Sequence, residues 1–329
     1  MKKQEEYSWL SEVNSQSLQA KLEDLDKAYV SFFKKKTNFP KFKSKKNNQS
    51  FRIPQSTKVD FENNKIYIPK FLKGIKFSNS RIFKGVVLSS TISKTPTNKY
   101  YISILVTDNK EIQTKPEIKE ETTIGIDLGI TNFIALSTGE KIDNPKHLKH
   151  KLKKLKAEHR KLSRKQQGSN NREKQRIKLT KVYEKVTDSR KDFHHKLSHK
   201  LTHDNQVNTI IMETLDIKKM MKNERLAQHI QDCSWYQFQT FLNYKCDWYG
   251  KNFIQIGQYE PSSKLCTCGV INRELTLKDR VWTCKECDTI HDRDILAVNN
   301  IKKIGLGQSK FTSVENRNSD SLKQKSSKN

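Results

Sequence analysis

The stretch TIGIDLGITN, Thr123–Asn132, decides how the rest of the chain is interpreted. Ile124 and Ile126 are β-branched and apolar, and the run stops at Gly129, a pattern that predicts a buried strand ending in a tight turn. Asp127 then lies at a strand end, where a carboxylate is costly to desolvate unless a cation or a hydrogen-bond donor meets it. Asp127 is therefore either a turn-capping residue or one member of a group of carboxylates.

The composition favours a large polyanionic partner. The chain has 329 residues, enough for two or three domains, and its formal net charge is +28, from 64 Lys and Arg against 36 Asp and Glu. Such an excess of positive charge is typical of proteins that bind nucleic acid. The sequence has no apolar run of about 18 residues and no signal-peptide pattern, so we expect no membrane partner.

The first third of the chain predicts a helix followed by a small antiparallel β domain. Apolar residues recur at helical spacing within residues 1–36, short strand-like runs fill residues 37–108, and residues 109–121 are charged and predict a linker. The segment Phe39–Lys46 interleaves aromatic residues with lysines, which suits a surface that pairs with phosphates and stacks on bases. A basic loop with two core anchors is the alternative. The lysines of this predicted surface are Lys41, Lys43, Lys45 and Lys46.

Residues 146–200 form a strongly basic segment, with 20 Lys and Arg against 5 Asp and Glu. Apolar residues at helical spacing on both sides of Gly168–Asn171 predict a helical hairpin with cationic outer faces. A charged face is often only solvated, but an imbalance of this size favours contact with nucleic acid. The candidate contact residues are Lys153, Lys154, Arg164, Lys165, Arg172 and Arg176.

A second apolar strand, Thr209–Leu215, also carries an acid near its end, Glu213. A long helix is predicted over residues 226–249, followed by a short strand at Phe253–Ile256. Cys233 and Cys246 fall within this apolar helix, which predicts core positions for both. The order of strands and helices indicates a mixed α/β domain.

Two closely spaced cysteine pairs predict a zinc ribbon. Cys266 and Cys268 are separated from Cys284 and Cys287 by fifteen residues, a spacing typical of two knuckles that bring four thiolates to Zn²⁺ at about 2.3 Å. Free buried thiols are the alternative. The first pair is one residue shorter than a usual knuckle, and His291 lies close enough in the sequence to serve as a substitute ligand.

Asp292 and Asp294 follow the second cysteine pair, at the start of a predicted helix. Helix capping and the helix dipole explain acids at such a position, and this is the alternative for both. Asp127, Glu213 and Asp294 nevertheless all lie at element ends, which converge on one edge of an α/β sheet. Three carboxylates there suit two Mg²⁺ or Mn²⁺ ions about 4 Å apart that promote phosphodiester hydrolysis.

Several motifs together resemble the TnpB (OrfB) proteins of insertion sequences, which are related to type V CRISPR effectors. The motifs are FPKFK (Phe39–Lys43), GIDLG (Gly125–Gly129), LSHKL (Leu197–Leu201), IMETL (Ile211–Leu215), SSKLC (Ser262–Cys266) and HDRD (His291–Asp294). The resemblance implies an α/β fold: an RNase H-like (RuvC) domain with an inserted basic helical hairpin and a zinc ribbon, preceded by a helix and a small antiparallel, wedge-type β domain.

The implied domains follow the chain in order. They are a remnant helical recognition segment (1–36), a wedge-type domain (37–108), a linker (109–121), a RuvC-like domain (122–260) containing the hairpin (146–200), a zinc ribbon (261–290), a final RuvC helix (291–304) and a disordered tail (305–329). Family members usually begin with a strand and a helix before the equivalent of Trp9, so a truncated N-terminus is expected.

The resemblance also implies an activity and its residues. Asp127, Glu213 and Asp294 are the expected RuvC carboxylates and Mg²⁺ ligands, because the second aspartate of HDRD matches the family's third acid. The expected function is RNA-guided cleavage of double-stranded DNA in the prokaryotic cytosol, at the nucleoid. The guide RNA comes from the transposon end, and its pairing carries the specificity.

Two other functions are compatible with the same residues. One is an RNA-guided DNA-binding protein or repressor that no longer cuts, which an incomplete N-terminus favours. Leu296, at a position where the family commonly has Asn, is a further departure from the family pattern. The other is a conventional transposase, which also uses three acids on an RNase H-like fold. Its third acid would not normally follow a zinc ribbon, so this function ranks last.

Overall fold

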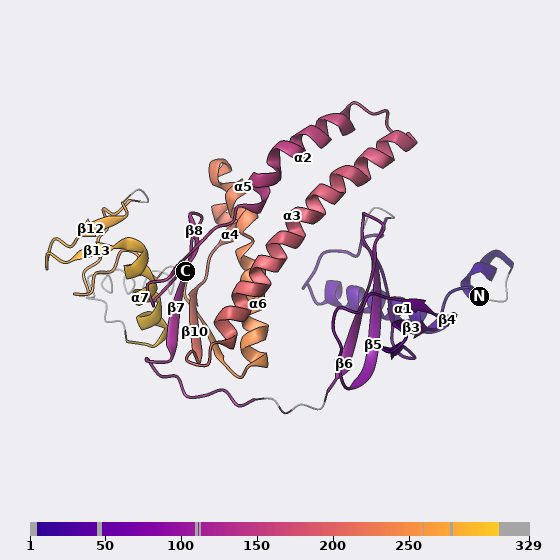
Figure 1. Cartoon of the computed structure of the whole chain (residues 1–329), viewed down its shortest axis with the longest axis horizontal. Coiled ribbons are helices and arrows are strands. Elements are labelled where there is room, and N and C mark those ends of the chain that lie inside the picture. Colours follow the sequence, from indigo (N-terminus) through magenta and orange to yellow (C-terminus); the bar gives the residue numbers. More distant parts are fainter. Residues whose placement is uncertain are drawn as a thin grey trace, which may run out of the picture. The chain divides into compact units, whose positions relative to one another are not determined.

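The computed structural model describes residues 5–308, except 45–47, 109, 110, 112, 259, 277 and 278. The chain divides into two compact units, which are described separately (Figure 1). Unit 1 comprises Met1–Glu111 and Gly168–Lys181, and unit 2 comprises Ile112–Gln167 and Val182–Asn329. Lys45, Lys46 and the predicted tail beyond residue 308 lie outside the described residues.

Unit 1 begins with two helical pieces, in the segment 1–36 where the sequence predicts a helix. A 3₁₀ helix, η1 (Glu5–Ser11), precedes the α-helix α1 (Ser15–Phe33). The interruption is local, because the side chain of Asn14 caps α1 by accepting a hydrogen bond of 2.8 Å from the backbone N–H of Gln16. An N-cap residue has non-helical backbone angles, so it separates the two pieces.

Two three-stranded antiparallel sheets follow in unit 1, with the strand orders β1-β5-β6 and β2-β3-β4. Their strands are β1 (Gln49–Ile53), β2 (Lys58–Asp60), β3 (Lys65–Ile68), β4 (Phe71–Lys76), β5 (Val86–Lys94) and β6 (Tyr100–Thr107). Ile53, Ile66 and Ile68 form their shared buried cluster. The antiparallel β prediction for this segment is confirmed at the level of strands, although β4 was not foreseen.

Unit 2 is built on one five-stranded sheet with the order β11-β10-β7-β8-β9. Its strands are β7 (Thr123–Leu128), β8 (Asn132–Leu136), β9 (Lys141–Asp143), β10 (Thr209–Glu213) and β11 (Asn252–Ile256). β7, β10 and β11 are parallel, whereas β8 and β9 run antiparallel to their neighbours. The mixed α/β prediction is therefore correct.

The two faces of this sheet are covered by different helices. Ile126 and Met212 belong to a large buried cluster with residues of α3 (Asn170–His203), α5 (Glu224–Cys233) and α6 (Trp235–Trp248). The opposite face packs against α7 (Arg293–Gly305). A Cβ atom at Gly125 would collide with the carbonyl oxygen of Val298, so the absence of a side chain there lets α7 lie close to β7.

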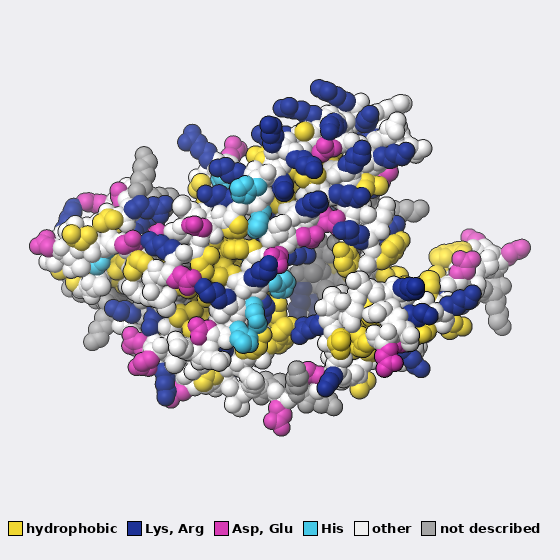
Figure 2. Space-filling view, viewed as in Figure 1, with side chains coloured by type: hydrophobic (Ala, Val, Ile, Leu, Met, Phe, Trp, Pro, Cys, Tyr) yellow, Lys and Arg dark blue, Asp and Glu magenta, His cyan; other side chains and the backbone are white. Residues whose placement is uncertain are grey.

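The basic segment is a helical hairpin, as predicted, formed by α2 (His147–Ser163) and α3. The His159 ring nitrogen Nε2 and the Tyr183 hydroxyl lie 2.7 Å apart across it. Lys and Arg side chains spread over the surface of these helices in Figure 2. Within the described part of the chain, no helix is long and apolar enough to cross a membrane.

The prediction of one long helix over residues 226–249 is wrong in one respect, because the segment forms two helices. A short helix α4 (Ile217–Met220) precedes α5, and α5 ends before α6 begins at Trp235. The break lies at Ser234, whose backbone is left-handed with φ 50°. Arg190 of α3 donates hydrogen bonds to Ser234 Oγ (3.0 Å) and to Asp232 (3.3 Å), so a distant residue stabilises the corner. Cys233 and Cys246 are buried core residues, as expected.

Candidate active site

The register of the parallel strands brings Asp127 and Glu213 together. Ile211 pairs with Gly125 and Met212 pairs with Ile126, so the next residues along β10 and β7 are Glu213 and Asp127. Adjacent strands lie about 4.8 Å apart, and residues at the same register level project to the same face. Both carboxylates therefore lie at the carboxyl ends of neighbouring parallel strands, where open α/β sheets bind their ligands.

The protein environment makes charge on these two carboxylates costly. Burial, together with the nearby negative charge of Asp294, raises the pKa of Asp127 to about 7. Burial also raises the pKa of Glu213 to about 7, with an added contribution from Asp127. Mutual repulsion between partly desolvated carboxylates is typical of functional sites, and a bound cation would relieve it.

Asp292 and Asp294 have different roles at the start of α7. Asp292 is the N-cap, because its Oδ1 accepts hydrogen bonds from the backbone N–H groups of Asp294 (2.9 Å) and Ile295 (3.1 Å). The capping alternative therefore describes Asp292. Asp294 lies in the first turn with its carboxylate partly exposed, and it is the acid whose charge acts on Asp127.

Two cations flank Asp294, and sequence reasoning identified neither. Lys141 Nζ lies 3.1 Å from Asp292 Oδ2 and 3.6 Å from Asp294 Oδ2. Arg280 lies 3.4 Å from Asp294 Oδ1 through one guanidinium nitrogen. Lys141 belongs to β9, a three-residue strand that is too short and too polar to show an alternating pattern, and its pairing with β8 exists only in the folded sheet.

The four ribbon cysteines converge, including both members of the short first pair. Their sulfur atoms all lie within 4.8 Å of one another, with Cys266–Cys287 at 3.5 Å and Cys268–Cys284 at 3.7 Å. Four sulfurs bound to one Zn²⁺ at about 2.3 Å lie about 3.8 Å apart, so the arrangement fits a tetrahedral ion. The four thiolates complete a tetrahedral ligand set without His291, whose Nε2 lies 3.0 Å from Cys266 Sγ, at hydrogen-bonding distance.

The carboxylates do not form an equally tight group. Over the described ranges, the four cysteines are the one set of three or more His, Cys, Asp or Glu residues whose ligand atoms all lie within 4.8 Å of one another. Asp127, Glu213 and Asp294 are thus spaced more widely than one small ion requires. Two ions bridged by separate carboxylates do not need mutual contact of all ligands, and oxygen donors suit Mg²⁺ or Mn²⁺.

The cysteine-containing ribbon leads directly into Asp294. Its hairpin consists of β12 (Val281–Thr283) and β13 (Ile290–Asp292), and the last residue of β13 is the cap of α7. The backbone N–H of Arg293 donates to the carbonyl oxygen of Arg280 (2.8 Å), which holds the junction together. The position of Asp294 is therefore set on one side by the ribbon and on the other by the sheet.

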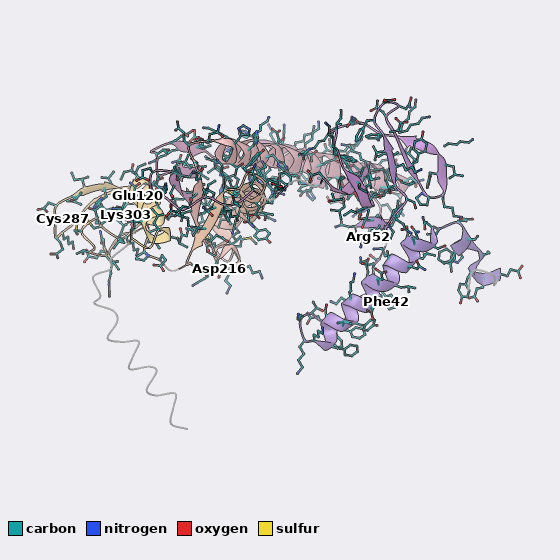
Figure 3. All side chains as sticks on the ribbon, turned by 90° about the horizontal axis from the view of Figure 1, so that it is seen from below. Phe42, Arg52, Glu120, Asp216, Cys287 and Lys303 are labelled. Atoms are coloured by element: carbon teal, nitrogen blue, oxygen red, sulfur yellow. The ribbon has the colours of Figure 1, made fainter. Side chains whose placement is uncertain are left out.

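A cavity of about 400 Å³ lies beside α7 and the ribbon. Thr267 of the first cysteine pair, Asn299 of α7 and Glu120 contribute to its lining, together with Lys302 and Lys303. Figure 3 shows the labelled Glu120 and Lys303 close to α7, with Cys287 farther along the ribbon. Sequence reasoning gave no sign of this cavity, because Glu120 and Thr267 meet the lining residues of segment 290–303 only in the folded chain.

The candidate nucleic-acid residues are mostly solvent-accessible. Six are exposed, namely Lys41, Lys43, Lys153, Lys154, Arg164 and Lys165. Arg176 is also exposed but forms a two-point ion pair with Glu173 (2.8 and 2.5 Å), and Arg172 is partly buried. Their role in binding stays a prediction.

Comparisons with known proteins agree with these features. The family described as "Probable transposase" (OrfB/IS605) matches residues 103–224, and the "Cas12f1-like, TNB domain" matches residues 235–301. A protein named "Putative RNA-guided DNA endonuclease" from Streptomyces pristinaespiralis is 38% identical over 311 residues, covering 94% of this chain and 76% of the relative. "Putative RNA-guided DNA endonuclease InsQ" of Escherichia coli K12 is 31% identical over 315 residues, covering 91% of this chain and 77% of the relative.

Two solved structures are also similar, at lower sequence identity. A CRISPR-Cas12f ternary complex matches with a TM-score of 0.43 and 19% identity over 66% of this chain and 45% of that chain. A Cas12f1–sgRNA–target DNA complex matches with a TM-score of 0.41 and 17% identity over 83% of this chain and 74% of that chain. On the strength of its curated relatives, the chain belongs to the OrfB/IS605 (TnpB) family.

Proposed function

We propose that this protein is an RNA-guided DNA endonuclease of a transposable element, with an RNase H-like (RuvC-type) nuclease domain in unit 2. The observation that carries the proposal is the strand register that makes Asp127 and Glu213 neighbours on the face covered by α7, whose first turn contains Asp294. The names of two relatives, which cover most of this chain, support the same activity.

Asp127, Glu213 and Asp294 would hold Mg²⁺ or Mn²⁺, which supplies an activated water and stabilises the leaving oxygen of the phosphodiester. The protein places the three acids and partly shields them from water, so that electrostatic interactions between charges there are stronger than in bulk water. The raised pKa values mean that Asp127 and Glu213 release their protons when a cation binds. In the metal-free protein, Lys141 and Arg280 form ion pairs with the Asp294 carboxylate.

The basic surfaces would bind a guide RNA from the transposon end and the target double-stranded DNA. Exposed lysines on α2 and in the segment after α1 supply positive charge, and the exposed Phe39 and Phe42 lie beside Lys41 and Lys43. We assign residues 37–108 to the wedge-type domain and residues 146–200 to nucleic-acid contact. A protein with these partners acts in the prokaryotic cytosol, at the nucleoid.

The decisive experiment measures RNA binding and DNA cleavage separately. The full chain is purified with its RNA and incubated with a plasmid that carries the matching target, with and without Mg²⁺. We expect Mg²⁺-dependent cleavage that is lost in Asp127→Ala, whereas the co-purified RNA remains bound. Asp143→Ala is the matched control, because Asp143 is an exposed acid on the same sheet.

Two outcomes would count against this proposal. Cleavage that persists in Asp127→Ala would refute the assignment of the site. RNA and target binding without any cleavage by the unaltered chain would instead identify a guided DNA-binding protein.

A further inference from the structure

Asn300 connects α7 to the first cysteine pair. Its side-chain amide nitrogen donates hydrogen bonds to the carbonyl oxygens of Ser262 (2.8 Å) and Leu265 (2.6 Å), the latter immediately before Cys266. Asn300 is 4% exposed, and both acceptor residues are buried. Because a buried carbonyl oxygen needs a donor, this side chain holds the segment before Cys266 in one position.

The second cysteine pair reaches α7 by a different route. Cys284 and Cys287 lie in the turn of the β12–β13 hairpin, and β13 continues without a gap into the cap residue Asp292. His291 of β13, which follows the second pair, also contacts Cys266 Sγ of the first pair. Both halves of the zinc centre are therefore attached to α7, one through the main chain and the other through Asn300.

This arrangement closes a ring that includes Asp294. A Zn²⁺ ion held by the four cysteines would join the two pairs. β13 joins the second pair to the first turn of α7, and Asn300 joins the first pair to the same helix six residues after Asp294. The sheet supports the other face of α7 through the buried Val298 and Ile301. Removing either the zinc ion or the Asn300 bonds opens the ring and frees the first turn to shift.

We propose that Asn300 is a positioning residue that makes the placement of the Asp294 carboxylate depend on the zinc centre. The proposal rests on the proposed function, since it takes Asp294 to be a ligand of the catalytic metal ions. Residues that do not bind a metal ion but hold its ligands in position typically lower metal affinity by about 10- to 100-fold when they are removed. Loss of the Asn300 bonds should have an effect at the lower end of that range.

Asn299 provides a matched control. It is the neighbouring residue of the same type, it lines the cavity beside α7, and it is only partly buried. The full chain, freed of RNA and loaded with zinc, is titrated with Mn²⁺ as a spectroscopic stand-in for Mg²⁺, and free Mn²⁺ is followed by electron paramagnetic resonance. Asp127→Asn defines the Mn²⁺ binding that belongs to the carboxylate site. Zinc content and the rate of zinc loss to a chelator are measured on the same samples.

We expect Asn300→Ala to retain zinc, to lose it faster to the chelator, and to bind Mn²⁺ about tenfold more weakly than the unaltered chain. Asn299→Ala should match the unaltered chain in all three measurements. Removing zinc from the unaltered chain should weaken Mn²⁺ binding to the same extent, and removing it from Asn300→Ala should add little, because the ring is already open.

Equal Mn²⁺ affinity of zinc-loaded Asn300→Ala and Asn299→Ala would overturn the inference while leaving the proposed nuclease function intact. Unchanged Mn²⁺ affinity after zinc removal would overturn it as well. If Asn300→Ala does not fold or holds no zinc, Asn300→Ser takes its place, because its shorter hydroxyl has one hydrogen and cannot donate to both Ser262 and Leu265; the same comparison with Asn299→Ala then decides. Absence of any Asp127-dependent Mn²⁺ binding in the unaltered chain would refute the carboxylate site itself, and with it both proposals.

Discussion

The four-cysteine cluster, which is the proposed zinc centre, and the proposed carboxylate site of unit 2 are assembled in opposite ways. The four cysteines lie within the short segment Cys266–Cys287, and their sulfurs already lie at distances that suit one ion. The three acids come from β7, β10 and α7, elements that are distant along the chain, and they remain more widely spaced. The difference shows that a local cluster depends on its own loops, whereas a dispersed site depends on strand register and helix placement.

Removal of a zinc ligand should have the largest effect, because it tests the local half of this comparison. We expect Cys284→Ser to lose its zinc and to unfold the ribbon, since structural zinc contributes about 10 kcal/mol or more to small zinc domains. DNA cleavage should fall by at least about 100-fold, because Asp294 follows the ribbon directly. Zinc content, cleavage rate and bound RNA are measured together. Cys233→Ala is the control, because Cys233 is a buried thiol outside the cluster; full cleavage without zinc would contradict the prediction.

Whereas removing a cysteine ligand should destabilise the protein, neutralising Asp127 should stabilise it. The pKa of Asp127 is 3.8 in the unfolded chain and is raised to about 7 in the folded protein. Ionisation of Asp127 therefore lowers the free energy of unfolding as the pH rises from 3.8, and this loss is complete once the pH has passed through 7. Asp127→Asn removes that loss, and we expect the metal-free variant to be more stable at pH 8 by about 2–4 kcal/mol, with a smaller gain at pH 5. Urea unfolding at both pH values measures this difference.

The matched control for the Asp127→Asn measurement is Asp143→Asn, an exposed acid on β9 that should change little. A variant that is less stable than the unaltered chain at pH 8 would show that Asp127 has a stabilising partner in the metal-free protein. The charge on Asp127 would then not destabilise the metal-free protein, and this difference from the cysteine cluster would not exist.

The smallest effect concerns Lys141, which neutralises Asp294 in the absence of metal ions. Its ammonium group competes with an incoming cation, and exposed ion pairs of this kind contribute about 0.2–1 kcal/mol. We therefore expect Lys141→Met to bind Mg²⁺ about two- to fivefold more tightly, whereas Lys141→Arg keeps the charge and the affinity. The Mg²⁺ concentration that gives half of the thermal stabilisation is the measurement. Weaker Mg²⁺ binding in Lys141→Met would mean that the lysine positions Asp294 rather than competing for it.

Sequence reasoning succeeded where local patterns carry the information. The apolar strands that end in Asp127 and Glu213, the basic hairpin and the cysteine pairs were all recognisable from spacing alone. It failed at β9 and at the break between α5 and α6. β9 is polar and is defined by its partner β8, and the corner at Ser234 is stabilised by Arg190 of a different helix. In both cases the deciding contact comes from a distant part of the chain.

The sequence by itself determined the residue types, the strand ends that carry two acids, the family and the four cysteines that converge. Tertiary structure decided which acids meet, because only the parallel pairing of β7 with β10 aligns Asp127 with Glu213. It also separated Asp292, whose carboxylate caps α7, from Asp294, whose charge acts on Asp127. The physical reason is that capping and spacing act over a few residues, whereas register, burial and electrostatic coupling arise only when distant segments pack together.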